Sequence, residues 1–124
     1  MKLKIFILGL LACANCMAAS KLSFEEEYYS FLEKIHTIQS QRDNFIKKNA
    51  NKNLNNSQRK KLDSIECTYM QSELKYDEFL VARFKDYKVF MKKSGQEVSS
   101  DKELIKTDIE SLKEEINSPD GKCK

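Results

Sequence analysis

The four cysteines of this 124-residue chain are the side chains most able to form a disulfide or to bind a metal. Cys13 and Cys16 lie in the first nineteen residues, and Cys67 and Cys123 lie in the remaining 105. An even pair of cysteines in an oxidising compartment favours a disulfide. The alternatives are free or intermolecular thiols, or a zinc site that would have to combine both cysteines with His36. We therefore predict a structural Cys67–Cys123 disulfide and no bound metal.

Arrangements typical of enzyme active sites are missing from the sequence. Nucleophilic catalysis generally needs a base beside the nucleophile, and the only histidine, His36, falls on the flank of a predicted helix. The acidic run at 25–27 begins that helix, where its ordinary role is to complement the helix dipole. A glycine-rich phosphate loop is excluded because only Gly95 and Gly121 follow the first nineteen residues. We predict a protein that is not an enzyme and binds no cofactor.

Residues 1–19 have the pattern of an export signal. Lys2 and Lys4 precede an apolar run over 5–14, and small residues follow at 16–19, where a signal peptidase could cut. The run is too short to span a bilayer, which takes about twenty apolar residues. We therefore predict a signal peptide over 1–19 and a periplasmic or secreted protein.

A lipoprotein signal is the alternative reading of the same segment. The run Leu10-Leu11-Ala12-Cys13 matches a lipobox, in which Cys13 would be acylated and would anchor the chain to the outer membrane. Cleavage there would leave Cys16 as an odd thiol beside the Cys67–Cys123 pair. Cleavage of a plain signal peptide leaves an even number of cysteines and is therefore favoured. We expect membrane association only if Cys13 is lipidated.

Charge is distributed unevenly along the chain. Removing Lys2 and Lys4 from the 22 bases leaves 20 against 19 acids, a net charge of +1. Seven bases against one acid fall in residues 41–61, whereas seven acids against three lysines fall in residues 101–120. We predict a bipolar molecule that can steer a charged protein partner and that binds no nucleic acid. The alternative is that these charges are solvated helix faces.

Apolar periodicity predicts a first helix over 24–48. Ser23 and Glu26 have the spacing of a capping box, and the apolar residues that follow recur at intervals of three and four. An asparagine-rich segment over 49–56 comes next. Asparagine side chains compete for backbone hydrogen bonds, so this segment is predicted to be a loop.

Two more helices are predicted beyond that loop. Ser57 can cap a helix over 57–93, which contains neither Gly nor Pro. Ser100 and Glu103 have the spacing of a second capping box, which begins a helix over 100–117.

The three predicted helices form one domain over 20–124, of the all-α class: a small antiparallel three-helix bundle with one disulfide. The third helix, packed antiparallel on the second, would end beside residue 77. Six further residues reach roughly 20 Å, which brings Cys123 within range of Cys67. The second helix is longer than its neighbours, so its apolar surface must be covered by both of them or by a partner.

Residues around Cys67 resemble a family motif. They are similar to the motif of the LprI-type lysozyme inhibitor family at Leu54, Gln58-Arg59 and Glu66-Cys67-Thr68-Tyr69, with Tyr29, Leu32 and Ile35 upstream. The resemblance covers about residues 25–70, although the Trp that the family has after the Gln-Arg pair is absent here. It implies an exported, disulfide-bonded helical protein that binds lysozyme and inhibits it.

Lysozymes are commonly basic, so an inhibitor would present an acidic surface. Two surfaces fit this expectation, one at the start of the first helix and one on the third: Glu25, Glu26 and Glu27, and Asp108, Glu110, Glu114 and Glu115. The alternative function is a structural or interaction protein, either a helical homo-oligomer or a small surface lipoprotein. A glycosylation sequon at Asn55-Asn56-Ser57 also allows a secreted eukaryotic factor.

Overall fold

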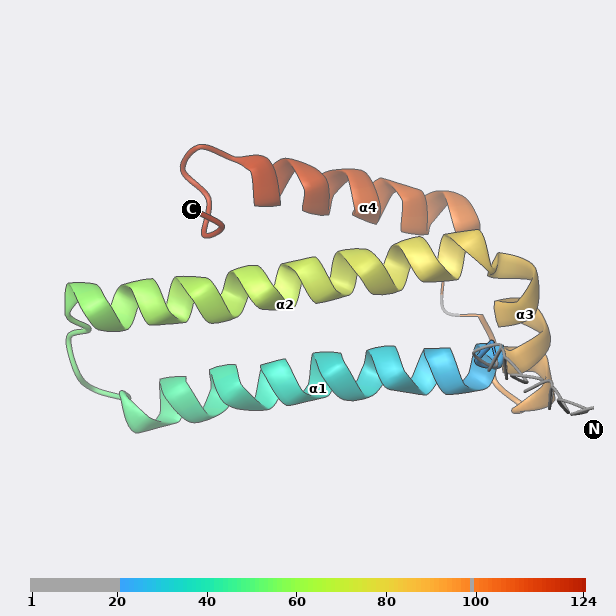
Figure 1. The fold of residues 1–124 in the computed structure, drawn as a ribbon, viewed down its shortest axis with the longest axis horizontal. Helices are drawn as coiled ribbons and strands as arrows, with labels where there is room; N and C mark the ends of the chain where they lie inside the picture. The colour runs from blue at the N-terminus through green and yellow to red at the C-terminus, as the bar shows by residue number, and fades with distance from the viewer. Residues whose placement is uncertain (1–20, 99) are drawn as a thin grey trace, which may run out of the picture.

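The structure is a computed structural model that describes residues 21–98 and 100–124 (Figure 1). Within these residues the chain contains no strand and forms four helices: α1 (Phe24–Lys48), α2 (Asn56–Ala82), α3 (Phe84–Lys93) and α4 (Lys102–Asn117). The predicted all-α class is confirmed. The predicted signal peptide and Cys13 lie outside the described residues. Within the described ranges, no helix is both long enough and apolar enough to cross a membrane.

Hydrogen bonds from side chains fix both ends of α1, which spans the residues predicted for the first helix. The Ser23 hydroxyl accepts from the Glu26 N–H at 3.2 Å, and the Glu26 carboxylate accepts from the Ser23 N–H at 2.8 Å. At the other end, the Asn49 side-chain amide donates to the Phe45 carbonyl at 2.8 Å. Asn51 then takes a positive φ of 64°, a conformation that asparagine tolerates better than most residues. The chain thereby turns back toward α2.

The caps of α2 and α4 correct two sequence predictions. Asn55, rather than Ser57, caps α2, and its side chain accepts from the N–H of Gln58 at 2.8 Å. Asp101, rather than Ser100, caps α4, and its carboxylate accepts from the Leu104 N–H at 2.8 Å. Each helix begins where an Asn or Asp side chain reaches the third residue of its first turn.

The helix predicted over 57–93 is in fact two helices, which corrects that prediction. The chain leaves helical geometry at Arg83, with φ −115° and ψ 33°, and α3 runs across the end of the α1–α2 pair (Figure 1). A straight continuation would carry Tyr87 and Met91 past the ends of the neighbouring helices. The corner instead buries them, leaving Tyr87 3% and Met91 6% exposed. Burial of these two side chains is the physical reason for the corner.

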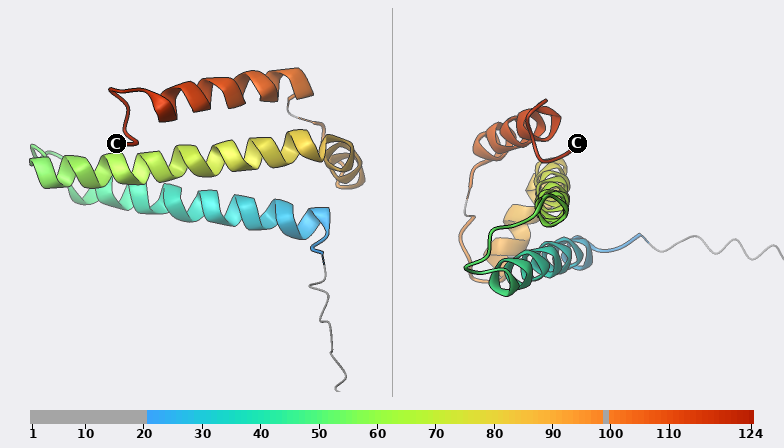
Figure 2. Two further views of the ribbon diagram at one scale, coloured as in Figure 1. Left: turned by 45° about the horizontal axis from the view of Figure 1, so that its top comes forward. Right: turned by 90° about the vertical axis from the view of Figure 1, so that its left-hand side faces the viewer.

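The four helices meet in one buried cluster at the α3 end of the molecule. Every helix contributes to it: Phe24, Leu80, Tyr87, Met91, Ile105 and Ile109. Away from this cluster, α2 lies between α1 and α4 and packs along both, while α1 and α4 make no extensive contact with each other (Figure 2). The long helices therefore form an open arrangement that α3 closes at one end.

The predicted disulfide is present and ties the C-terminal tail to α2. Cys67 and Cys123 are joined with their Cα atoms 5.0 Å apart. The tail folds back at Gly121, where a Cβ would meet the Glu115 carbonyl oxygen at 2.7 Å, so only glycine fits there. Beside the disulfide, Lys122 forms an ion pair with Glu66. A covalent bond and an ion pair thus hold the tail on the same stretch of α2.

Candidate functional site

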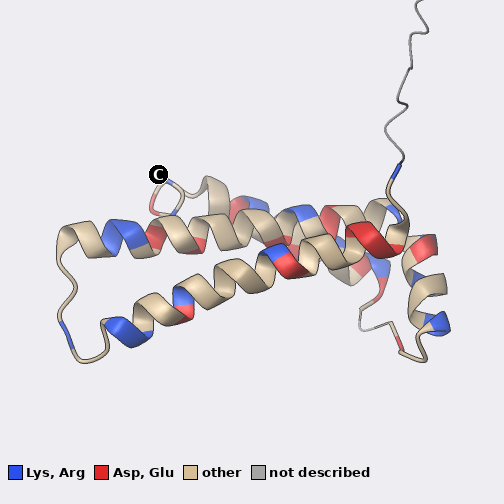
Figure 3. Ribbon diagram, turned by 60° about the horizontal axis from the view of Figure 1, so that its bottom comes forward, with Lys and Arg blue, Asp and Glu red and all other residues tan. Residues whose placement is uncertain are grey.

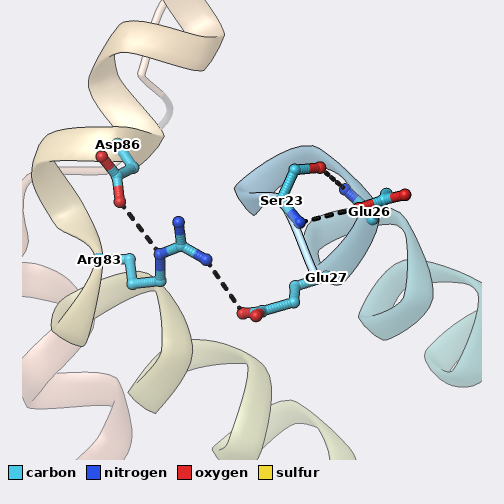
Figure 4. Close-up of polar contacts among 5 residues, drawn as sticks. All are labelled: Ser23, Glu26, Glu27, Arg83 and Asp86. Atoms are coloured by element: carbon cyan, nitrogen blue, oxygen red, sulfur yellow. Dashed lines mark hydrogen bonds and ion pairs between the residues drawn. The ribbon is translucent and has the colours of Figure 1, made fainter. Parts of the chain in front are cut away.

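The acidic residues at the start of α1 are largely engaged in structural contacts (Figure 4). Glu26 belongs to the capping box, and the backbone hydrogen bond from Ser23 lowers the pKa of its carboxyl. Glu27 accepts from the Arg83 guanidinium at 3.2 Å. Glu25 is exposed and forms no ion pair with a described residue. Of the three predicted acids in this surface, one remains free to meet a partner.

Arg83 ties the predicted acidic surface to the α2–α3 corner. Its Nε donates to Asp86 at 3.0 Å while its Nη1 reaches Glu27, and its guanidinium lies 5.2 Å from the centre of the Phe24 ring. The two carboxylates raise the pKa of Arg83 further, with the hydrogen bond to Asp86 first. One side chain therefore holds the first turns of α1 and α3 at the end of α2.

The four acids predicted on α4 lie in different surroundings. Glu110 forms an ion pair with Lys113 at 3.5 Å, and Lys113 also reaches Glu78 of α2 at 3.7 Å. Glu114 is exposed and has no ion pair within the described ranges. The other two predicted acids, Asp108 and Glu115, line a groove that α4 shares with α1 and α2.

This groove, here called the acidic groove, has a volume of about 470 Å³. Its lining contains four carboxylates and no basic side chain, and all three long helices contribute: Leu32, Ile35, Glu73, Tyr76, Asp77, Asp108, Ser111, Leu112 and Glu115. It exists because α1 and α4 pack on α2 without closing on each other. The lining therefore combines aliphatic and aromatic side chains with four carboxylates.

Burial and repulsion from neighbouring carboxylates both raise the pKa of Asp77. That pKa is raised to about 6, first by burial and then by the carboxylates of Asp108 and Glu73. Burial, followed by a hydrogen bond with Tyr28, raises the pKa of Tyr76 far above its ordinary value, so its hydroxyl remains protonated. At neutral pH the groove therefore concentrates negative charge, and none of its four carboxylates forms an ion pair with a described residue.

Replacing Asp77 with Asn should stabilise the protein at neutral pH. The folded-state pKa lies above the unfolded value, so between about pH 4 and pH 6 the native state keeps a proton that the unfolded state has released. The corresponding stability is present below pH 4 and is lost as the pH rises through 6. Since water reaches the groove and screens the repulsion, we expect Asp77→Asn to raise the free energy of unfolding by about 1 kcal/mol at neutral pH.

Urea denaturation between about pH 4 and pH 8 measures this effect. Asp43→Asn is the matched control, because Asp43 is exposed on α1 and has no ion pair in the described part of the chain. The control should gain no stability at neutral pH. If Asp77→Asn proved no more stable than the wild-type protein at neutral pH, the carboxylate would not be under electrostatic strain.

Sequence reasoning found half of the groove acids. It placed Asp108 and Glu115 on the third predicted helix but missed Glu73 and Asp77. These two lie four residues apart, so they share one face of α2 and repel each other. A like-charged pair at that spacing was the available signal.

The groove carboxylates are not arranged as a metal site. Among the residues that the structure describes, no group of three or more His, Cys, Asp or Glu side chains could hold a metal ion. His36 is exposed on α1 and does not line the groove. No family model, no curated protein and no solved structure matches this chain.

Proposed function

We propose that this chain is an exported, non-enzymatic binding protein whose acidic groove holds a basic segment of a protein partner. The observation that carries the proposal is the groove lining, which has four carboxylates, several apolar side chains and no basic side chain. Lysine and arginine side chains fit such a groove, because their methylene stems can cover Leu32, Ile35 and Leu112 while their charged ends meet the acids. The raised pKa of Asp77 supports this: burial is its main cause and repulsion by Asp108 and Glu73 adds to it, and a bound cation would relieve that repulsion.

The size of the groove limits what can enter it. A volume of about 470 Å³ is in the range of small-ligand pockets and takes a few side chains rather than a folded domain. The partner therefore presents a protruding helix or loop that carries bases beside an apolar residue. Its remaining surface would rest on the rims formed by α1 and α4.

Lysozyme is the first partner to test. The resemblance of residues 25–70 to the LprI-type lysozyme inhibitor family suggests it, and a basic enzyme suits an acidic groove. The export pattern of residues 1–19 and the Cys67–Cys123 disulfide fit a protein that meets lysozyme outside the cytoplasm.

The test measures lysis of bacterial cell walls by several classes of lysozyme, with oxidised protein of residues 20–124 added to excess. A second basic protein, assayed by calorimetry, separates recognition of lysozyme from recognition of basic charge in general. Saturable inhibition near one-to-one stoichiometry supports lysozyme as the partner. Binding of neither protein would contradict the proposed function.

Neutralising two groove acids should weaken that binding. Each partly exposed ion pair contributes up to about 1 kcal/mol, or about fivefold in affinity, so Asp77→Asn with Asp108→Asn should weaken it roughly 25-fold. The matched control is Glu25→Gln with Glu114→Gln, which changes the net charge equally at two exposed acids. A larger loss in the control would move the site to the acidic surface predicted from the sequence.

A second candidate is an interaction protein that assembles with its own copies. Exposed apolar side chains favour it where α1 begins and α3 passes: Leu22 is 52% exposed, Tyr29 54% and Val89 62%. The Tyr29 ring lies edge-on to Phe90 at 6.0 Å, which joins the two helices in one apolar surface. Light scattering that shows a dimer at all concentrations would favour this candidate, and a monomer would favour the groove.

A membrane-anchored form is the alternative to a protein that is released after export. Acylation of Cys13 would make the chain a small surface lipoprotein, whereas cleavage after residue 19 would release it. The intact mass of the mature protein distinguishes the two forms.

A further inference from the structure

The turn between α1 and α2 gathers an unusual excess of positive charge. Residues 44–62, here called the hairpin end, comprise the last turns of α1, the loop and the first turns of α2. They contain no acid and six bases: Lys47, Lys48, Lys52, Arg59, Lys60 and Lys61. Figure 3 shows this charge at the tip of the α1–α2 hairpin, away from α3. The excess of bases in this part of the sequence therefore forms one positively charged tip in the structure.

The charge of the hairpin end is not neutralised within the described part of the molecule. None of its five lysine ammonium groups forms an ion pair or a hydrogen bond with a described residue. The Arg59 guanidinium donates only to the Leu54 carbonyl oxygen among the described residues, from Nε at 3.1 Å. The first turn of α2 also contains no acid to complement its dipole. An external anion would therefore meet ammonium groups that have no competing partner in the fold.

Apolar side chains near these lysines line two crevices at the surface. A crevice of about 470 Å³ is lined by the apolar Phe45 and Ile65 together with Lys48 and Lys61. A second crevice, of about 240 Å³, is lined by Ile46, Leu54 and Leu62 beside Lys52. Ile46 itself is 46% exposed, next to Lys47. The hairpin end thus combines anion-binding groups with an apolar surface at one tip.

We propose that the hairpin end binds the surface of an anionic phospholipid bilayer. The ammonium groups lie on the lipid phosphates, while Ile46 and the two crevices contact the acyl boundary beneath them. A soluble polyanion would satisfy the lysines but leave the apolar groups without a partner. This site is separate from the acidic groove and does not depend on the proposed function.

Co-sedimentation with vesicles tests the proposal on oxidised protein of residues 20–124. The probes are vesicles of phosphatidylcholine alone and vesicles in which about one third of the lipid is phosphatidylglycerol. We expect binding to the anionic vesicles only, with the bound fraction falling steeply as salt is raised, because the attraction is screened. Equal binding to both kinds of vesicle would overturn the proposal.

Charge reversal locates the site. Each base near an anionic surface raises the partition coefficient about fivefold, so Lys60→Glu with Lys61→Glu should lower it at least about 25-fold. The control, Lys85→Glu with Lys102→Glu, makes the same change in net charge at two exposed lysines on α3 and α4 that form no ion pair with a described residue. It should keep most of the binding, and circular dichroism should show both variants folded. An equal loss in both would mean that net charge alone acts, which overturns the proposal.

A third variant separates lipid from soluble polyanions. Ile46→Ser leaves the net charge unchanged and should lower vesicle binding severalfold while leaving retention on heparin unaltered. Retention on heparin without any vesicle binding would overturn the proposal in favour of a soluble polyanion. The groove variant, Asp77→Asn with Asp108→Asn, should retain full vesicle binding, so failure of one proposal does not imply failure of the other.

Discussion

Replacing both Cys67 and Cys123 with serine should lower the free energy of unfolding by about 4 kcal/mol. The two residues are separated by 56 positions, and a cross-link that closes a loop of this length removes that much chain entropy from the unfolded state. Small domains have total stabilities of roughly 5–15 kcal/mol, so the loss is a large fraction of the whole. Denaturation in urea, with circular dichroism as the readout, measures it.

The wild-type protein under reducing conditions is the control for this prediction. Its unfolding midpoint should fall to that of the double variant, and the reductant should leave the double variant unchanged. Calorimetry on the same samples would show whether the loss is entropic. An unchanged midpoint on reduction would mean that Lys122, Glu66 and the packing of α4 hold the tail without the covalent bond.

Replacing Leu80 with alanine should lower the free energy of unfolding by about 3 kcal/mol. Leu80 is 4% exposed and belongs to the cluster in which all four helices meet. Truncation there removes apolar contacts and leaves a cavity that rigid helices fill only in part. The corner at Arg83 should weaken with it, because Leu80 packs in the cluster that holds Tyr87 and Met91.

Leu104→Ala is the matched control, since it makes the same change at a leucine of α4 that is 51% exposed. Its effect should stay within about 0.5 kcal/mol, as is usual for surface substitutions. Urea denaturation of both variants at one pH gives the comparison. Equal losses in the two variants would show that helix propensity at these positions, and not burial, determines stability.

The elements that depend on local chemistry could be predicted from the sequence. The bounds of α1 follow from its capping box and its apolar stripe, both of which are contained in its own residues. The disulfide was predicted from the even pair of cysteines, and helix rise with chain reach showed that Cys123 can return to Cys67. The bounds of α1 and the pairing of the cysteines by count need no knowledge of how one helix is aligned with another.

The corner at Arg83 could not be predicted, because its cause is tertiary. No glycine or proline marks it, and the residues from 57 to 93 are individually compatible with one helix. The chain turns because Tyr87 and Met91 gain burial only when α3 crosses the end of α1 and α2. The sequence did show that a straight helix would be too long for its neighbours. It did not show that the chain would turn at Arg83.

The acidic groove was predictable only in part, for a related reason. Asp108 and Glu115 could be assigned to one acidic helix, but their meeting with Glu73 and Asp77 depends on the register between α4 and α2. That register is set by the packing of Ile105 and Ile109 on the core. Sequence periodicity predicts which residues share a face of one helix. It does not predict the register in which two helices pack.

The disulfide also divides the molecule into a closed loop and an open arm. Residues 67–123 form a covalent ring that contains α3, α4 and the second half of α2, whereas α1 lies outside it. A protease that cuts once anywhere between Cys67 and Cys123 produces two chains that remain joined. A cut in the loop between α1 and α2 separates α1 from the ring, with only side-chain packing left to retain it. The turn after α1 is therefore the one connection between helices in residues 21–124 whose cleavage by a protease divides the domain into two unlinked chains.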